Sequence, residues 1–225
     1  MRKLLHRVTD RLKKTAVDLA LPPNEAVRLN ALRRYDVLDT LPEPVFDDLT
    51  RMAAHICSMP VALIALIDEQ RLWFKSKLGV NLAEVPRDAS PCCHTILGDD
   101  LLVVEDVRRD PRFAGSPLVT EEPRIQFYAG MPLRTSDGFN IGTLFVADSR
   151  KRRLSSQQHE ALRILAHQVM VQLELRRHLV ELERSVFEQR RTQDALRNSE
   201  MFYQALVESL PQNILRKDTK GRFVF

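Results

Sequence analysis

The feature that most restricts the fold of this chain is residues 155–209, a stretch without a single proline or glycine. Both residue types interrupt helices, so the stretch predicts one long continuous helix. Ser155 and Gln158 form a capping box and mark its start. A helix of this length outlasts the core of an ordinary domain, which indicates that part of it connects domains.

The apolar pattern changes along this predicted helix. An early stripe has the spacing of a helix face that packs on a core: Leu162, Leu165, Ala166, Val169 and Leu173. A later set alternates steps of four and three, as in a coiled coil: Leu175, Leu179, Leu182, Val186, Gln189, Gln193 and Leu196. We therefore predict a coiled-coil signalling helix at residues 173–200 and a homodimer formed through it. The two glutamines make this a weak seam.

The preceding residues alternate between helix and strand patterns. One helix is predicted from a cap at Asn24 through about Leu38, and Pro42 and Pro44 are predicted to start another. The run VALIALID at residues 61–68 is apolar on both faces and predicts a central strand that is covered on both sides. Further strands are predicted at residues 71–79, 101–107, 127–133 and 140–148.

The charge of the chain is unevenly distributed. The formal net charge is +4, and residues 1–20, with six lysines and arginines against two aspartates, account for all of it. The neutral remainder argues against a nucleic-acid-binding protein. Residues 1–23 are predicted to form a basic amphipathic helix, for which weak membrane-surface contact (residues 1–20) and packing on a partner are the two interpretations. Without a signal-peptide or membrane-span pattern, a cytoplasmic location is expected.

The three cysteines, Cys57, Cys92 and Cys93, are too few for a disulfide framework. The stretch RDASPCCHTIL, residues 87–97, places two of them beside His94. Zinc sites need about four ligands, usually with more widely spaced cysteines, so we expect no metal here. The open interpretations are a buried helix start and a thiol of lowered pKa. No phosphate-binding or nucleophile motif is present, so we expect no catalytic residue.

Several motifs occur in collinear order across residues 24–172: RLNALRRYDVLDTLPEPVFDDLTRMAAHIC, PRDASPCCHTIL, DPRFAGSPLV and IQFYAGMPLRTSDGFNIGTLFVAD. Together they resemble a GAF domain. The resemblance implies an α+β fold with an antiparallel sheet of five or six strands, terminal helices on one face and a loop-covered pocket on the other. Cys92 and His94 match the Cys-x-His pattern of many such domains, whereas Pro91 departs from the usual aromatic residue. Bilin and cyclic-nucleotide signatures are missing, so no cofactor is expected.

Strand alternation and the resemblance together nominate pocket residues. These are Phe74, Cys92, His94, Phe113, Phe127, Tyr128, Met131, Thr143 and Phe145. Such a pocket suits an unidentified small apolar or aromatic ligand with one or two polar groups. The alternative is that these side chains simply fill the core.

Residues 201–225 resemble the opening of a PAS domain, with a helix followed by a hairpin that turns at residues 218–221. Such a domain would be incomplete. GAF domain, helix and PAS domain in series resemble the input region of bacterial sensor histidine kinases or diguanylate cyclases. We therefore expect a regulatory sensor module in cytoplasmic signal transduction, not itself an enzyme, that relays a conformational change to a downstream output domain. Two alternatives stay open: a cysteine-dependent enzyme of the methionine sulfoxide reductase type, using Cys92 and Cys93, and a ligand-free dimerisation scaffold.

Overall fold

The computed structural model describes residues 21–87, 90–114, 116–120, 124–209 and 218–222. Residues 1–20 of the basic helix predicted at residues 1–23, and most of the predicted PAS hairpin, lie outside these ranges. Among the described residues, none forms a helix long and apolar enough to cross a lipid bilayer. The chain divides into two compact units, Met1–Arg177 and His178–Phe225, which are taken separately below.

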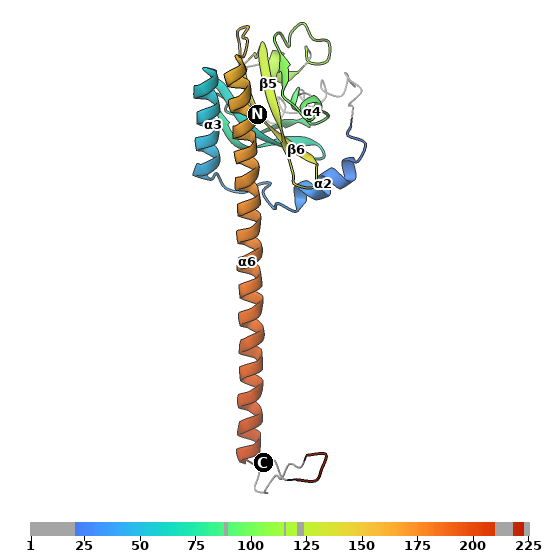
Figure 1. The fold of residues 1–225 in the computed structure, drawn as a ribbon, viewed down its shortest axis with the longest axis vertical. Coiled ribbons are helices and arrows are strands. Elements are labelled where there is room, and N and C mark those ends of the chain that lie inside the picture. Colours follow the sequence, from blue (N-terminus) through green and yellow to red (C-terminus); the bar gives the residue numbers. More distant parts are fainter. Residues whose placement is uncertain (1–20, 88–89, 115, 121–123, 210–217, 223–225) are drawn as a thin grey trace, which may run out of the picture. The chain divides into compact units, whose positions relative to one another are not determined.

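The first unit is built on one antiparallel sheet, with six strands among the described residues in the order β3-β2-β1-β6-β5-β4 (Figure 1). The strands are β1 (Val61–Ile67), β2 (Arg71–Leu78), β3 (Glu84–Pro86), β4 (Leu102–Val104), β5 (Phe127–Arg134) and β6 (Asn140–Asp148). The helices in the described part of the chain are α2 (Glu25–Arg33), α3 (Pro44–Cys57), α4 (Cys92–Thr95), α5 (Pro117–Thr120) and α6 (Ser156–Ser209). The predicted α+β fold and the central position of VALIALI are confirmed. The other central strand is β6, which also pairs with β5 in the predicted hairpin.

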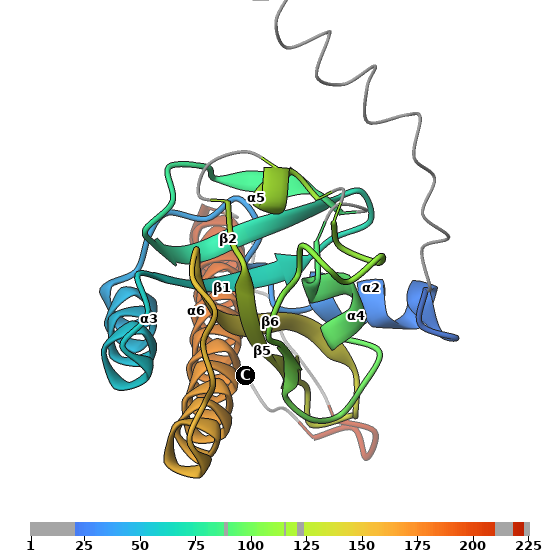
Figure 2. The ribbon, with the colours of Figure 1, turned by 90° about the horizontal axis from the view of Figure 1, so that it is seen from above.

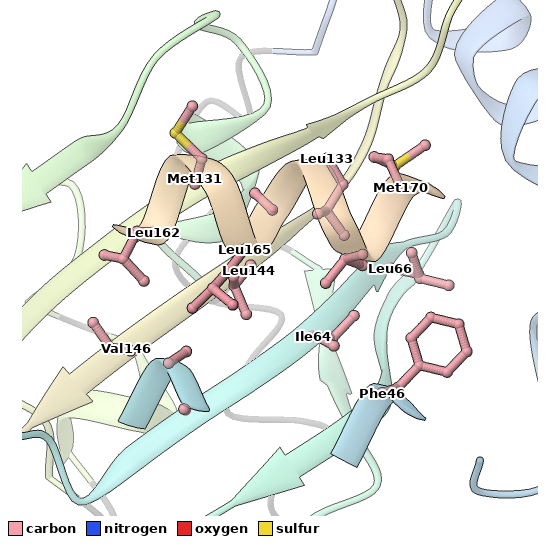
Figure 3. Close-up of a cluster of buried hydrophobic side chains, with 14 of the residues drawn as sticks. Phe46, Ile64, Leu66, Met131, Leu133, Leu144, Val146, Leu162, Leu165 and Met170 are labelled. Atoms are coloured by element: carbon pink, nitrogen blue, oxygen red, sulfur yellow. The ribbon is translucent and has the colours of Figure 1, made fainter. Parts of the chain in front are cut away.

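The helices divide between the two faces of the sheet, with α3 and α6 on one face and α4 and α5 on the other (Figure 2). On the first face, alternate residues of the central strands pack beneath α3 and α6, as the labelled side chains of Figure 3 illustrate. The stripe predicted for the start of the long helix is buried there, including Leu162, Leu165 and Val169. We call this apolar layer the helix-covered core.

The second face is covered by short helices and irregular segments. The intervening residues of the same strands, Leu63, Ala65 and Ile67 in β1 for example, pack against α4, α5 and the loops that join them. We call this layer the loop-covered core. Because strand side chains alternate between faces, the run of apolar residues in β1 serves both cores.

One irregularity changes which side chains of β2 face the helices. The pairing of β1 with β2 joins Ile64 to Ser76 and Ala65 to Phe74, so Lys75 has no partner and forms a β-bulge. Lys75 lies over the Phe46 ring at 5.2 Å, on the face that it would share with Trp73 in a regular strand. The bulge brings the following residue to the same face, where the Ser76 hydroxyl donates to Asp47 of α3 at 2.7 Å. The regular alternation expected from the sequence would have placed Ser76 with Phe74 on the opposite face.

The predicted capping box at the start of α6 is confirmed. The Ser155 amide donates to Gln158 Oε1 at 3.0 Å, and the Gln158 amide donates to Ser155 Oγ at 3.2 Å. The Gln158 side chain also donates to the carbonyl of Ile56 near the end of α3, at 3.1 Å. One residue therefore satisfies backbone groups at the ends of two helices on the same face.

In the second unit, the described part of α6 exposes its apolar residues. Leu179, Leu182 and Leu196 of the predicted seam are each more than half exposed. Beyond the helix, residues 218–222 form a turn in which the Asp218 amide donates to the carbonyl of Arg222 at 2.8 Å. The turn predicted at residues 218–221 is therefore present, whereas the strands expected on either side lie outside the described residues.

Other expectations need correction. The first helix ends at Arg33 instead of continuing to Leu38, and Asn24 makes no side-chain cap bond. The strand expected at residues 101–107 is reduced to the three residues of β4. The short strand β3 was not predicted, because its three residues carry no pattern of their own and form a strand only by pairing with β2.

Candidate functional site

The two cores separate the nine predicted pocket residues. Phe127 and Met131 lie in the helix-covered core, so the prediction that they line a pocket with the others is wrong. The reason is the period of two in β5, which turns Phe127, Ala129 and Met131 to one face and Tyr128 to the other. The remaining candidates are on or beside the loop-covered core: Phe74, Cys92, His94, Phe113, Tyr128, Thr143 and Phe145.

A single turn of helix, α4, places the Cys-Cys-His stretch over the sheet. The amides of Cys93 and His94 donate to the carbonyls of Ser90 and Pro91 at 3.2 and 3.0 Å. Cys92 and Cys93 are both buried, so adjacent residues of this short helix both face the interior. The Cys93 thiol lies 2.8 Å from the carbonyl oxygen of Arg87, to which it donates.

Tyr128 is the centre of the polar group beneath α4. Its hydroxyl lies 2.8 Å from Thr95 Oγ1 and 3.6 Å from Cys92 Sγ, and its ring packs on Phe145 with centroids 5.3 Å apart. The phenol extends over Gly130, where an added Cβ would lie only 2.1 Å from the Tyr128 oxygen. The glycine that the sequence placed inside a strand is therefore required by this side chain.

Burial governs the acid–base properties of this group. Burial raises the pKa of the Cys92 thiol, although Ser90, Thr143 and Tyr128 act in the opposite direction. The pKa of Tyr128 is raised well above its usual value, first by burial and then by the neighbouring Cys92. Both groups are therefore neutral at physiological pH, and the cluster acts by hydrogen bonding.

His94 lies at the margin of the same cluster. Its ring meets the edge of Phe113 at 4.9 Å between centroids, and the Arg112 guanidinium lies 4.7 Å above that phenyl ring. Burial lowers the pKa of His94, and the nearby Arg112 lowers it further. Neutral imidazole is therefore the dominant form near pH 7.

Three buried polar atoms around α4 have no hydrogen-bond partner: Thr143 Oγ1, His94 Nδ1 and Asn140 Oδ1. Thr143 lies close enough to Cys92 to influence the pKa of the thiol, without a hydrogen bond of normal geometry. Asn140 donates through Nδ2 to the carbonyls of Ile96 and Gly98 just beyond α4, at 3.0 and 2.8 Å. Buried polar atoms without partners are costly, so a group of them around one short helix calls for an explanation.

Sequence reasoning missed Thr95 and Asn140. Thr95 lies in the quoted stretch RDASPCCHTIL, and its position at the end of a one-turn helix placed it beside the cysteines. Asn140 is the first residue of β6. Its side chain contacts the backbone just after α4 only because the fold brings residues 96–98 alongside it. No local pattern in the sequence predicts the contact of Asn140 with residues 96–98.

The three thiols offer little nucleophilic character. Burial raises the pKa of Cys57 to about 11 and that of Cys93 to about 12. Thiolate, the reactive form, is then scarce at pH 7. Within the described ranges, no group of three or more histidine, cysteine or acidic side chains is arranged to hold a metal ion.

The comparisons with known proteins agree with this geometry. A sequence model of the GAF domain family matches residues 41–173. The chain belongs to the GAF family. The match agrees with the expected GAF fold.

One curated relative and two solved structures indicate the range of this family. The chain is 38% identical over 131 residues to the cyclic di-GMP phosphodiesterase PA2567 of Pseudomonas aeruginosa, covering 58% of this chain and 22% of that protein. The GAF domain of a phosphoenolpyruvate-protein phosphotransferase from Coxiella burnetii is 12% identical, with a TM-score of 0.54 over 70% of this chain and 99% of that one. The free methionine-R-sulfoxide reductase of Neisseria meningitidis is 16% identical, with a TM-score of 0.51 over 68% of this chain and 92% of that one.

Proposed function

We propose that this chain is the regulatory sensor part of a signalling protein. Its GAF domain would bind a small ligand at the loop-covered core and relay a change of packing through α6 to a downstream domain. The observation that carries the proposal is the continuity of α6, which starts as a core helix of the GAF domain and runs as one helix to Ser209. A helix shared in this way converts a change in core packing into movement at its far end.

The ligand site would lie beneath α4. Cys92, Tyr128 and Thr143 are fully buried, so a ligand could enter only if α4 and its loops moved outward. The unpartnered oxygens of Thr143 and Asn140 and the neutral His94 would offer it hydrogen bonds. This set favours a small molecule with an aromatic or apolar body and one or two polar groups.

A thermal-shift screen tests the sensor proposal. We expect at least one small metabolite of a panel of nucleobases, amino acids and aromatic acids to raise Tm in a concentration-dependent way. The same compound should lose most of its effect in Tyr128→Phe, whereas Tyr203→Phe, which changes an exposed tyrosine of α6, should respond like wild type. A panel without any stabilising compound would favour the second candidate function, a ligand-free scaffold whose loop-covered core is filled by its own side chains.

The proposed partner is a second copy of this chain, joined through residues 173–200. Support comes from the apolar residues of the predicted seam, which are exposed and recur at coiled-coil spacing: Leu175, Leu179, Leu182, Val186 and Leu196. Leu179→Glu should convert the dimer to a monomer in sedimentation experiments. Val180→Glu introduces the same charge one position away from the seam, at a similarly exposed residue, and should leave the dimer intact. Equal sedimentation of both variants and wild type would contradict a dimer formed through this seam.

The proposed output is a catalytic domain of a longer protein. Histidine kinase and diguanylate cyclase domains follow from the serial arrangement described above. The Pseudomonas relative adds a cyclic di-GMP phosphodiesterase domain to the candidates, and this chain covers only 22% of that protein. A full-length protein that shows none of these three activities in any ligand state would contradict this part.

We propose no catalysis by the GAF domain itself. The buried thiols with raised pKa values argue against the reductase alternative. An assay with free methionine sulfoxide and a dithiol reductant should give no turnover above that of a Cys92→Ala variant. Turnover that is lost in Cys92→Ala would establish the enzyme instead.

A further inference from the structure

The segment between α2 and α3, residues 35–43, lies between strand β2 and helix α6. We call it the strap. Its backbone turns twice through the left-handed region, at Asp36 (φ 45°) and Asp39 (φ 59°). Aspartate tolerates this conformation better than most residues, but it still costs free energy that surrounding contacts must offset.

Contacts from β2 hold one side of the strap. Arg71 pairs with the carboxylate of Asp39 at 2.6 Å. Lys75, whose side chain is fully buried, donates to Thr40 Oγ1 at 2.9 Å, to the Leu41 carbonyl at 3.0 Å and to Glu43 Oε1 at 2.5 Å. A buried ammonium group needs such partners, so the position of Lys75 and the shape of the strap depend on each other.

Contacts from α6 hold the other side. Arg176 donates to the carbonyls of Tyr35 and Asp36 at 3.1 and 2.9 Å, and to Glu43 Oε1 at 3.0 Å. The Tyr35 hydroxyl donates to Glu174 at 2.6 Å. These α6 residues follow Leu173, the last side chain of the helix in the helix-covered core.

One carboxylate oxygen therefore joins the strand to the helix. Glu43 Oε1 accepts from Lys75 of β2 and from Arg176 of α6. Burial opposes ionisation of Glu43, but the hydrogen bonds from the two cations outweigh it, and its pKa is lowered. The carboxylate remains charged at physiological pH, so the bridge is intact there.

The position of Lys75 links this bridge to the opposite face of the sheet. It is the bulge residue of β2, without a partner in β1, and its chain neighbour Phe74 lies in the loop-covered core. A displacement of Phe74 must move the adjacent peptide of Lys75. The pairing of β2 with β1 does not hold that peptide in place, because Lys75 is the bulge residue.

We propose that the Lys75–Glu43–Arg176 bridge is the coupling element that makes the hold on α6 depend on the packing of the loop-covered core. This inference rests on the proposed sensor function and names the path by which a change in the loop-covered core would reach α6. A change at Phe74 would shift Lys75, weaken its bond to Glu43 and release Arg176, which loosens α6 at the point where it leaves the core.

Hydrogen exchange of the α6 amides at residues 173–180 tests the hold directly. Glu43→Gln keeps the shape of the side chain and removes its charge, and we expect protection to fall about tenfold, the effect of weakening a charged hydrogen bond. Glu160→Gln is the matched control, because Glu160 forms an exposed pair with Arg163 on the same helix. If both variants leave protection equal to wild type, the strap does not hold α6.

A double-mutant cycle tests the route. Phe74→Leu should lower protection at residues 173–180 in the wild-type background and have no further effect in the Lys75→Met background. The same cycle with Glu43→Gln in place of Lys75→Met gives a second reading if the buried lysine variant fails to fold. Equal effects of Phe74→Leu in both backgrounds, or no effect in either, would overturn the proposal. No ligand is used, so failure here leaves ligand binding unaffected, and failure of the ligand screen leaves this result standing.

Discussion

The two faces of one sheet differ in what they pack against. On the helix-covered side, long helices α3 and α6 bury a layer that is apolar almost throughout. On the loop-covered side, one-turn helices and loops cover a layer that includes Cys92, Thr95, Tyr128 and Thr143. The first arrangement supplies stability, and the second contains the polar groups of the proposed ligand site. Mutations on the two faces should therefore have different consequences.

The largest effect is expected on the helix-covered face. Leu162→Ala removes a fully buried side chain and should lower the free energy of unfolding by about 2–5 kcal/mol. Ile164→Ala, two residues along the same helix, truncates a side chain that is 52% exposed and should cost much less. Urea unfolding of the three proteins measures both values. Similar losses for the two variants would contradict the assigned face of α6.

A smaller loss is expected beneath α4. Tyr128→Phe removes the hydroxyl that bonds Thr95 and contacts Cys92, and should cost about 1–2 kcal/mol while leaving the ring packing on Phe145. Chemical denaturation checks the magnitude, with Tyr203→Phe as the exposed control. A neutral Tyr128→Phe substitution would show that these hydrogen bonds contribute nothing net to the loop-covered core.

The same face should also contain a substitution that stabilises the protein. Thr143→Val exchanges a buried hydroxyl without a partner for a methyl group of similar shape, and should raise the unfolding free energy by about 1 kcal/mol. If the hydroxyl serves a ligand, the variant should at the same time respond more weakly in the thermal-shift screen. A loss of stability would indicate that Thr143 has a hydrogen-bond partner in solution.

The smallest effect concerns pH. The pKa of folded His94 is lowered, so the unfolded chain binds the proton more readily, and this residue favours folding above its unfolded pKa of about 6.5. That contribution is lost progressively as pH falls below this value. Unfolding free energies at pH 7.5 and 5.5 should therefore differ less in His94→Gln than in wild type. An identical pH difference in the two proteins would exclude His94 as a contributor.

Much of the architecture follows from local patterns. The capping box at Ser155 and Gln158, the central strand of residues 61–67 and the buried stripe of α6 were all predicted, because each is specified by residues close together in the chain. The same period of two would also have separated Phe127 from Tyr128, since neighbours in a strand face opposite sides. Including both in one pocket was an error of interpretation that the sequence itself contradicts.

Only tertiary structure decided the features on which the candidate site and the proposed coupling depend. The bulge at Lys75 arises from how β2 pairs with β1, and the strap takes its shape from cations on β2 and α6. Asn140 reaches α4 through the sheet, and β3 exists only as a partner of β2. These features need contacts between residues far apart in the chain. Local periodicity specifies the face of an element but not its neighbour, because the neighbour is chosen by the packing of the whole domain.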